Sequence, residues 1–171
     1  VLDQTYSDFE LICCDDTSTD ATYDRLREFQ DPRITLFRND RNQGSTATTY
    51  RCYGHSSGEY VSWLTTDDAY EPRMLETLVG YLDAHPDVLG VFGGARFVDD
   101  ESNPMEGSWT DEGVGMDRWQ LLHAVFHLRH PFCAPAAMIR RSAFAEVGYF
   151  PAHVMQCNDM HMWIRLLFHG A

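Results

Sequence analysis

Two adjacent aspartates, Asp67 and Asp68, follow an apolar stretch that reads YVSWLT and ends at Thr65. Like charges side by side repel each other, and a carboxylate close to an apolar strand is costly unless a cation compensates it. Carboxylate oxygens are also the ligands that Mg²⁺ and Mn²⁺ prefer in proteins. The pair is therefore a candidate metal site. The alternative is a solvated turn that happens to carry two acids.

A second acidic pair, Asp15 and Asp16, follows the apolar stretch FELICC. If both apolar stretches are strands of one parallel sheet, both pairs lie along the same edge, where ligands bind in open α/β sheets. The alternative is that the second pair stabilises the N-terminus of the next helix. Capping would fall more naturally to Ser18 or Asp20, which leaves Asp16 for a ligand.

The elements that must position these acids alternate between strand and helix patterns. Short apolar runs bounded by turn residues predict strands at 9–14, 33–37, 60–65, 88–98 and 136–140. Apolar residues at helical spacing, with caps and breakers at the ends, predict helices at about 19–29, 45–57, 72–84, 116–128, 141–147 and 158–169. Gly93 and Gly94 suggest a bend, and residues 99–115 are predicted to form a loop. This alternation predicts one α/β domain over 1–171, with a largely parallel central sheet flanked by helices.

The composition excludes some function classes. Of the 171 residues, 13 are Lys or Arg and 26 are Asp or Glu, so the net charge is −13. A nucleic-acid binder needs a basic face, so we expect no nucleic-acid partner. No apolar run approaches the roughly 20 residues of a membrane span. Five cysteines without a CxxC motif favour reduced thiols over disulfides or zinc.

The sequence resembles the family 2 glycosyltransferases, which have the GT-A (nucleotide-diphospho-sugar transferase) fold. The segments that carry the resemblance occur in the family's order and span nearly the whole chain: LDQTYSDFELICCDDTSTDAT, NQG, SGEYVSWLTTDDAYEPRML, AMIRRSAFAEVGYF and NDMHMWIRL. The resemblance implies an inverting, metal-dependent hexosyltransferase. Such an enzyme moves a sugar from a nucleotide-diphosphate donor, here a UDP-sugar, to an acceptor hydroxyl in polysaccharide or glycan synthesis.

By this resemblance, Asp67 and Asp68 match the family's metal motif and would hold Mg²⁺ or Mn²⁺, with Asp67 also meeting the nucleotide-sugar. The commonest pattern is LDxDD, and Thr65 occupies the place of its first aspartate, although some members have TDD. Mg²⁺ takes only one or two carboxylates together with substrate oxygens, so two acids are enough. Which of the two binds the metal stays open, with Asp68 favoured.

The resemblance also assigns nucleotide-binding residues. Asp16 corresponds to the aspartate that accepts a hydrogen bond from the base, typically from uracil N3–H, and Asp15 precedes it at the strand end. Arg51 lies where the family often has a basic residue near the diphosphate. Thr49 and Tyr50 depart from the commoner RN pair, so a solvated surface arginine is an equal alternative.

Asp159 falls where the family keeps its general base, within an ED motif. Here Asn158 replaces the glutamate, and His161 follows two residues later. The alternative is an ordinary acid in the first turn of a helix. His123, His127 and His130 could share a helical face and bind zinc, but no HExxH pattern accompanies them, so a half-buried helix is the better interpretation.

Two other function classes stay open. Thr65 and Asn158, both at acidic positions of the motifs, favour a non-catalytic nucleotide-sugar or carbohydrate-binding module on the same fold. A nucleotidyltransferase would normally show a Gly-rich, basic phosphate loop, and this sequence shows none.

The resemblance further suggests that the chain is an internal fragment, because family members have a strand before LDQTY and continue beyond FHGA. We therefore expect a GT-A domain that lacks its first strand. The expected partners are a nucleotide-sugar donor and a carbohydrate or lipid-linked acceptor. The expected location is cytoplasmic, and peripheral membrane association, the oligomeric state and the identities of donor and acceptor stay open.

Overall fold

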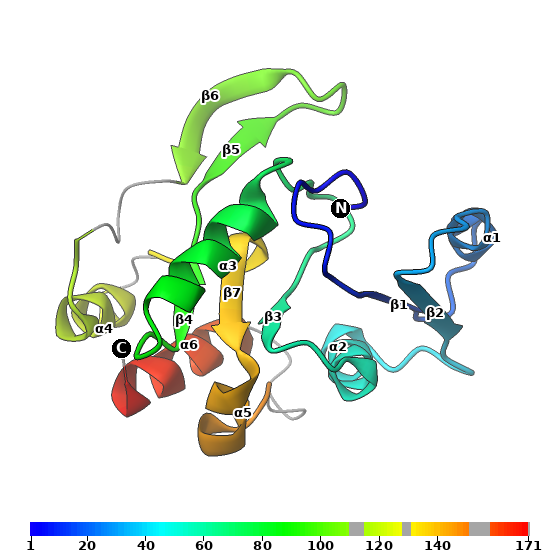
Figure 1. Ribbon diagram of the computed structural model, residues 1–171. Coiled ribbons are helices and arrows are strands. Elements are labelled where there is room, and N and C mark those ends of the chain that lie inside the picture. The colour runs from blue at the N-terminus through cyan, green and yellow to red at the C-terminus, as the bar shows by residue number, and fades with distance from the viewer. Residues whose placement is uncertain (110–114, 128–130, 151–157, 171) are drawn as a thin grey trace.

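The computed structural model describes residues 1–109, 115–127, 131–150 and 158–170. Figure 1 shows these residues as short strands covered by helices, with a two-stranded hairpin extending away from the remainder. Two groups of elements follow one another along the chain. In the first, a strand ends at Asp15, and in the second, a strand leads into the loop that holds Asp67 and Asp68.

The first group is built on a parallel strand pair. Strands β1 (Leu11–Asp15) and β2 (Ile34–Arg38) pair in parallel, and the register sets Asp15 opposite Arg38. Parallel strands need a crossover, which contains helix α1 (Thr22–Arg27). Helix α2 (Ser45–His55) follows β2 and packs against β1. We call β1, β2, α1 and α2 the first lobe.

The second group is built on a three-stranded sheet. Its strands are β3 (Tyr60–Ser62), β7 (Ala137–Arg140) and β4 (Gly90–Phe92), hydrogen-bonded in that order. Both outer strands pair antiparallel with β7, so β3 and β4 run in the same direction. A 3₁₀ turn, η1 (Ala134–Ala136), leads into β7. We call this sheet and its covering helices the second lobe.

Helices cover both faces of the three-stranded sheet. Helix α3 (Met74–Ala84) buries its apolar stripe against Met138 of β7. The other face packs on α4 (Arg118–Phe126), α5 (Arg141–Val147) and α6 (Asn158–His169), which surround Ala137 and Ile139. Because successive residues of a strand point to opposite faces, β7 lies at the centre of both apolar clusters.

The strand predicted over 88–98 is divided in the structure. It forms β4 and then β5 (Ala95–Val98), with the predicted bend at Gly93 and Gly94 between them. The loop predicted over 99–115 was wrong for residues 104–109, because β6 (Pro104–Trp109) pairs antiparallel with β5. Proline is tolerated at the first position of an edge strand. Gly107 has φ 101°, and a Cβ there would lie 3.3 Å from the Phe97 ring.

The α/β class is confirmed, but the acidic pairs do not end strands of one continuous sheet. Among the described residues, β1 and β2 form a sheet separate from β3, β7 and β4. The antiparallel direction of β7 could not be predicted, because apolar patterning is the same for either strand direction. The expectation of a shared edge was therefore too simple, and side chains must connect the two lobes.

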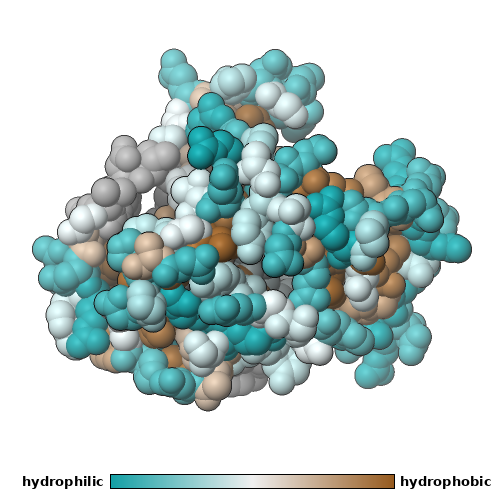
Figure 2. Space-filling model, viewed as in Figure 1, coloured by the Kyte–Doolittle hydropathy of each residue, from teal (hydrophilic) through white to brown (hydrophobic). Residues whose placement is uncertain are grey.

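The apolar surface is distributed unevenly between the lobes. Leu11, Ile12, Cys13 and Cys14 of β1 stay half-buried, and Figure 2 shows apolar residues gathered over this part of the molecule.

The cysteines Cys13, Cys14, Cys52 and Cys133 are all free thiols, as predicted. None of the helices in the described ranges has both the length and the apolar content that crossing a membrane requires.

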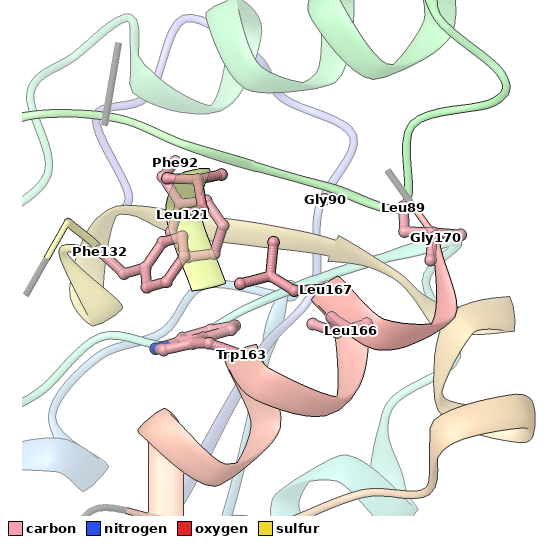
Figure 3. A pocket seen from close by; sticks show the side chains of 9 residues that line it. All are labelled: Leu89, Gly90, Phe92, Leu121, Phe132, Trp163, Leu166, Leu167 and Gly170. Atoms are coloured by element: carbon pink, nitrogen blue, oxygen red, sulfur yellow. The ribbon is translucent and has the colours of Figure 1, made fainter. Parts of the chain in front are cut away.

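A small apolar cavity of about 120 Å³ lies in the second lobe between β4, α4 and α6. Figure 3 shows Phe92, Phe132 and Trp163 at one end of it and Leu89 and Gly170 at the other. No acidic residue lines this cavity, so the candidate chemistry must be sought at the ends of β1 and β3.

Candidate functional site

At the end of the first lobe's sheet, Asn39 joins two of the predicted site residues. This side chain is 2% exposed and directly follows β2. Its Nδ2 donates to Asp16 Oδ1 at 2.7 Å, and its Oδ1 accepts from the Arg51 guanidinium and, at 3.6 Å, from Cys14 Sγ. The predicted nucleotide-binding residues Asp16 and Arg51 are therefore brought together through a buried amide.

The Asp16 carboxylate also organises the turn before α2. Gln43 N donates to Oδ1 at 2.9 Å, and Gly44 N donates to Oδ2 at 2.8 Å. Burial acts to raise the pKa of Asp16, but the hydrogen bonds from Asn39, Gln43 and Gly44 together outweigh it and hold that pKa below its ordinary value. Asp16 is thus an ionised, oriented carboxylate.

Asp15 has a different environment, because its side chain is 0% exposed. Arg38 Nε lies 2.8 Å from its Oδ2, and Ser18 N donates to the same oxygen at 3.2 Å. Arg38 in turn donates to the Ser18 carbonyl at 2.7 Å. Asp15 therefore stabilises the turn that follows β1, and its oxygens are not open to solvent. The expected capping by Ser18 is wrong, since its backbone is the group that is bound, whereas Asp20 does accept from Thr22 N at 3.0 Å.

The turn between these two acids and α1 is strained. Thr17 has φ 63°, a left-handed conformation that a β-branched residue adopts only when its surroundings impose it. Its hydroxyl donates to the Asp16 carbonyl at 2.6 Å. Strain of this kind gathers at functional sites, which is consistent with a ligand site at the end of β1.

Arg51 lies flat on the first lobe. Its guanidinium is 4.5 Å from the centre of the Phe37 ring and donates to the Arg38 carbonyl at 3.3 Å. Together with the Asn39 contact, this arrangement holds the charge of α2 beside the ends of β1 and β2. Arg51 is therefore half-buried and anchored, and its role toward a nucleotide stays a prediction.

The second acidic pair lies in the exposed loop that follows β3. Asp68 N donates to the Thr65 carbonyl at 3.2 Å, and the Thr65 hydroxyl donates to the Asp68 carboxylate. The Asp67 side chain is exposed and makes no hydrogen bond to any of the residues described. Thr65 stands where the commonest motif has a further acid, and here it orients Asp68. Asp67 has no such hydrogen bond among the described residues.

Tyr70 closes this loop from its far end. Its hydroxyl lies 2.9 Å from the Trp63 carbonyl and 2.7 Å from Ser62 Oγ, which itself donates to Ala137 O at 2.6 Å. Burial raises the pKa of Tyr70 to about 12, and the nearby Asp68 charge adds to the rise. The Asp68 charge also adds to the raised pKa of buried Cys133, after burial itself. The Asp68 charge therefore lies close enough to Tyr70 and Cys133 to act on both.

Asp159 is the second residue of α6 and is half-buried in its first turn. The helix dipole stabilises a carboxylate at this position. Helix α6 reaches the strand that leads to the acidic loop, since the rings of Trp163 and Trp63 are 6.4 Å apart. The helix that carries the base candidate thus contacts Trp63, which lies between β3 and the acidic loop.

A divalent ion would fit the loop after β3 only with help from a substrate. No three acidic, histidine or cysteine side chains in the described part of the chain could hold an ion by themselves. Asp67 and Asp68 offer hard oxygens at an exposed position, and Mg²⁺ or Mn²⁺ takes substrate oxygens and water for its other ligands. The three histidines that were candidates for zinc lie elsewhere. The rings of His123 and His127 stack with their centres 4.0 Å apart, and both residues are exposed, whereas His130 lies outside the described residues.

Asn39 and Tyr70 are the residues that sequence reasoning missed. A signal existed for Asn39, because it follows a strand that pairs in parallel with the strand before Asp16, so both must lie at one edge. Tyr70 had no such signal. It looked like one more apolar residue after the acids, and only the fold brings its hydroxyl back to Trp63.

Comparison with known proteins gives a consistent result. The family model described as "Glycosyl transferase family 2" matches residues 1–148. The protein EpsE of Bacillus subtilis (strain 168) is 29% identical over 180 residues, which cover 99% of this chain and 60% of EpsE. WfgD of Escherichia coli, named UDP-Glc:alpha-D-GlcNAc-diphosphoundecaprenol beta-1,3-glucosyltransferase, is 34% identical over 82 residues, or 48% of this chain and 32% of WfgD.

A solved structure agrees with the fold. The mannosyltransferase PcManGT from Pyrobaculum calidifontis, in complex with GDP-Man and Mn²⁺, superposes with a TM-score of 0.69 at 20% sequence identity. The match covers 98% of this chain and 46% of that one. The chain therefore spans about half the length of the proteins it matches.

Proposed function

Because the chain belongs to glycosyltransferase family 2 and has the GT-A fold, we propose that it forms the catalytic core of an inverting, metal-dependent sugar transferase in polysaccharide synthesis. The donor is a UDP-sugar, and the acceptor is a carbohydrate or lipid-linked hydroxyl. The observation that carries the proposal is the combination of an oriented carboxylate at Asp16 with an exposed acidic pair at Asp67 and Asp68.

The first lobe binds the nucleotide in this proposal. Asp16 is ionised, and its Oδ2, which accepts its one short hydrogen bond from Gly44 N, keeps a lone pair that can accept from the N3–H of uracil. Arg51, held by Asn39, supplies positive charge near the diphosphate. Asp15 contributes through Arg38, because its own carboxylate is buried in that ion pair.

Asp67 and Asp68 would hold Mg²⁺ or Mn²⁺, and substrate oxygens would complete its ligands. When bound, the ion stabilises the charge that grows on the departing diphosphate. PcManGT, bound to GDP-Man and Mn²⁺, supports a divalent ion in a protein of this fold. The Thr65 hydroxyl keeps Asp68 oriented, and Asp67, which has no such contact among the described residues, would be available to the ion or to a sugar hydroxyl.

Asp159 acts as the general base. Its carboxylate takes the proton of the acceptor hydroxyl while the acceptor oxygen bonds to the anomeric carbon, on the face opposite the breaking bond to the diphosphate. The products are the inverted glycoside, the nucleoside diphosphate and a protonated Asp159, which returns its proton to solvent. Asn158 leaves Asp159 as the single acid at this position of the motif.

We also propose that the chain is part of a longer transferase that works in the cytoplasm, with an acceptor that a membrane lipid can carry. WfgD acts on a diphosphoundecaprenol-linked sugar according to its name, which supports this class of acceptor. The second candidate is a non-catalytic nucleotide-sugar binding module, which Thr65 favours because it occupies an acidic position of the motif.

A donor screen on the full-length protein separates the two candidates. Purified protein is incubated with UDP- and GDP-sugars, with Mn²⁺ or with EDTA, and release of the nucleoside diphosphate is followed in the presence of lipid-linked acceptors. Transfer from a UDP-sugar that EDTA abolishes is the expected result. Tight UDP binding without transfer would favour the binding module, and transfer from GDP-sugars alone would overturn the choice of donor.

A further inference from the structure

The two lobes are not joined by strand pairing, so side-chain contacts at their boundary hold them together. In the described ranges no strand of the first lobe is hydrogen-bonded to the sheet of the second. At the start of β3 the lobes are connected by polar contacts: Glu10 accepts from Gly58 N at 2.8 Å, and Arg141 donates to Ser56 Oγ at 2.6 Å. At the other end of β3, where the acidic loop begins, the contacts are aromatic.

Tyr149 lies at the centre of these aromatic contacts. Its ring stacks on Tyr53 of α2 at 4.1 Å and meets Tyr50 of the same helix at 5.6 Å. Its hydroxyl oxygen accepts a hydrogen bond of 2.7 Å from Nε1 of Trp63, the residue that follows β3. A single side chain therefore contacts both the helix that carries Arg51 and the strand that leads to Asp67.

Helix α6 fixes the position of Tyr149. Arg165 of α6 donates to the Tyr149 carbonyl at 2.7 Å and also to the Val147 carbonyl. Gly148, between these two residues, has φ 76°, and a Cβ there would lie 3.0 Å from Arg165 Nη1. Trp63 meets Trp163 of the same helix. Helix α6, which carries Asp159, thus supports the contact that Tyr149 makes between α2 and Trp63.

We propose that Tyr149 is a positioning residue that sets the separation between the nucleotide-binding lobe and the metal-binding loop. This inference rests on the proposed function. A nucleoside diphosphate with its ion must reach from Asp16 in one lobe to Asp67 and Asp68 in the other, whereas the nucleoside alone needs only the first. The Tyr149 contact therefore matters for ligands that span the lobes and not for ligands that occupy one.

The test compares two tyrosines of the same cluster. Tyr149→Phe removes the hydroxyl that Trp63 binds, while Tyr53→Phe removes a hydroxyl with no hydrogen bond in the described residues. Calorimetry on the full-length protein measures the affinity for UDP with Mn²⁺ and for uridine without metal. Tyr149→Phe should weaken UDP–Mn²⁺ binding about fivefold, the loss expected for one hydrogen bond, and leave uridine affinity unchanged. Tyr53→Phe should match the wild type for both ligands.

Each outcome has a distinct meaning. If Tyr149→Phe binds UDP–Mn²⁺ as the wild type does, or loses uridine affinity equally, the positioning role is overturned. If Tyr149→Phe fails to fold, Tyr50→Ala decides, since Tyr50 is 57% exposed and its removal leaves no buried cavity. The same selective loss, about threefold for a weaker ring contact, supports the role, and no loss overturns it. If the wild-type protein bound UDP equally well with and without Mn²⁺, the proposed function would instead be refuted.

Discussion

The two acidic pairs of this chain are both predicted at strand ends, yet they differ in how the protein treats them. Asp15 and Asp16 are surrounded by donors: Arg38 and Ser18 N for the first, Asn39 and two backbone amides for the second. Asp67 and Asp68 are exposed in a loop, and the side-chain contact within that pair is the Thr65 hydroxyl on Asp68.

The difference separates a prebuilt site from one that a ligand must complete. A carboxylate that accepts several N–H groups has its charge compensated by the fold and can read a hydrogen-bond donor at no further cost in repulsion. Two neighbouring carboxylates without such donors repel each other until a cation arrives. In the proposed function, the first lobe therefore provides recognition of the nucleotide, and the loop after β3 provides the place where binding depends on an ion.

The largest effect is expected when one of the two charges of the loop after β3 is removed. Asp67→Asn and Asp68→Asn should each lower sugar transfer about 10²–10³-fold, because each removes electrostatic stabilisation of the departing diphosphate. Thermal stability should stay unchanged or rise, since one of two repelling charges is gone. Transfer is measured at saturating donor over a Mn²⁺ titration.

Asp100→Asn is the matched control, because Asp100 is an exposed acid in the hairpin, away from both strand ends. It should retain full transfer. If Asp67→Asn and Asp68→Asn also retained it, the loop would be a solvated turn and the ion site would have to be sought elsewhere.

Removal of the buried Asn39 amide in the first lobe should lower the stability of the protein, in contrast to the substitutions in the loop. Asn39→Ala leaves Asp16 and Arg51 without their shared partner in a site that is 2% exposed in the wild type. The free energy of unfolding should fall by about 2–3 kcal/mol, the cost of unpaired buried polar groups. Urea denaturation measures this change, and Asn103→Ala in the exposed hairpin is the control. An Asn39→Ala protein as stable as that control would contradict the claim that the first lobe is prebuilt.

Sequence reasoning predicted the elements better than their connections. Alternating patterns located β1, β2, β3, β7 and most helices, because apolar spacing reports local structure directly. It missed β6, whose Pro104 and Gly107 are typical of loops, and it assumed one sheet where the described residues form three. The acids at the strand ends were identifiable, and so was the place of Asn39 after a strand. The contacts of Asn39 and Tyr149 join distant segments, however, and local patterns do not encode such contacts.

A smaller change tests how the loop is held without touching its charge. Tyr70→Phe removes the hydroxyl that lies 2.9 Å from the Trp63 carbonyl and closes the loop around Asp67 and Asp68. The protein should lose about 1 kcal/mol of stability, the net worth of one hydrogen bond, and its Mn²⁺ requirement for transfer should rise by a few-fold. Tyr81→Phe, at an exposed position of α3, is the control. An unchanged Mn²⁺ requirement would mean that the ion alone orders the loop.

The smallest effect is expected from acid, through the titration of Asp16 in the first lobe. The pKa of Asp16 is lowered from its ordinary value of 3.8, so the hydrogen bonds to its carboxylate contribute fully above that value. They are lost as the pH falls below about 4 and through the lowered pKa. Amide exchange at Gln43 and Gly44, corrected for intrinsic rates, should therefore quicken in this range. In Asp16→Asn, which cannot titrate, protection at these amides should not change with pH, and an equally steep dependence there would assign the effect to another group.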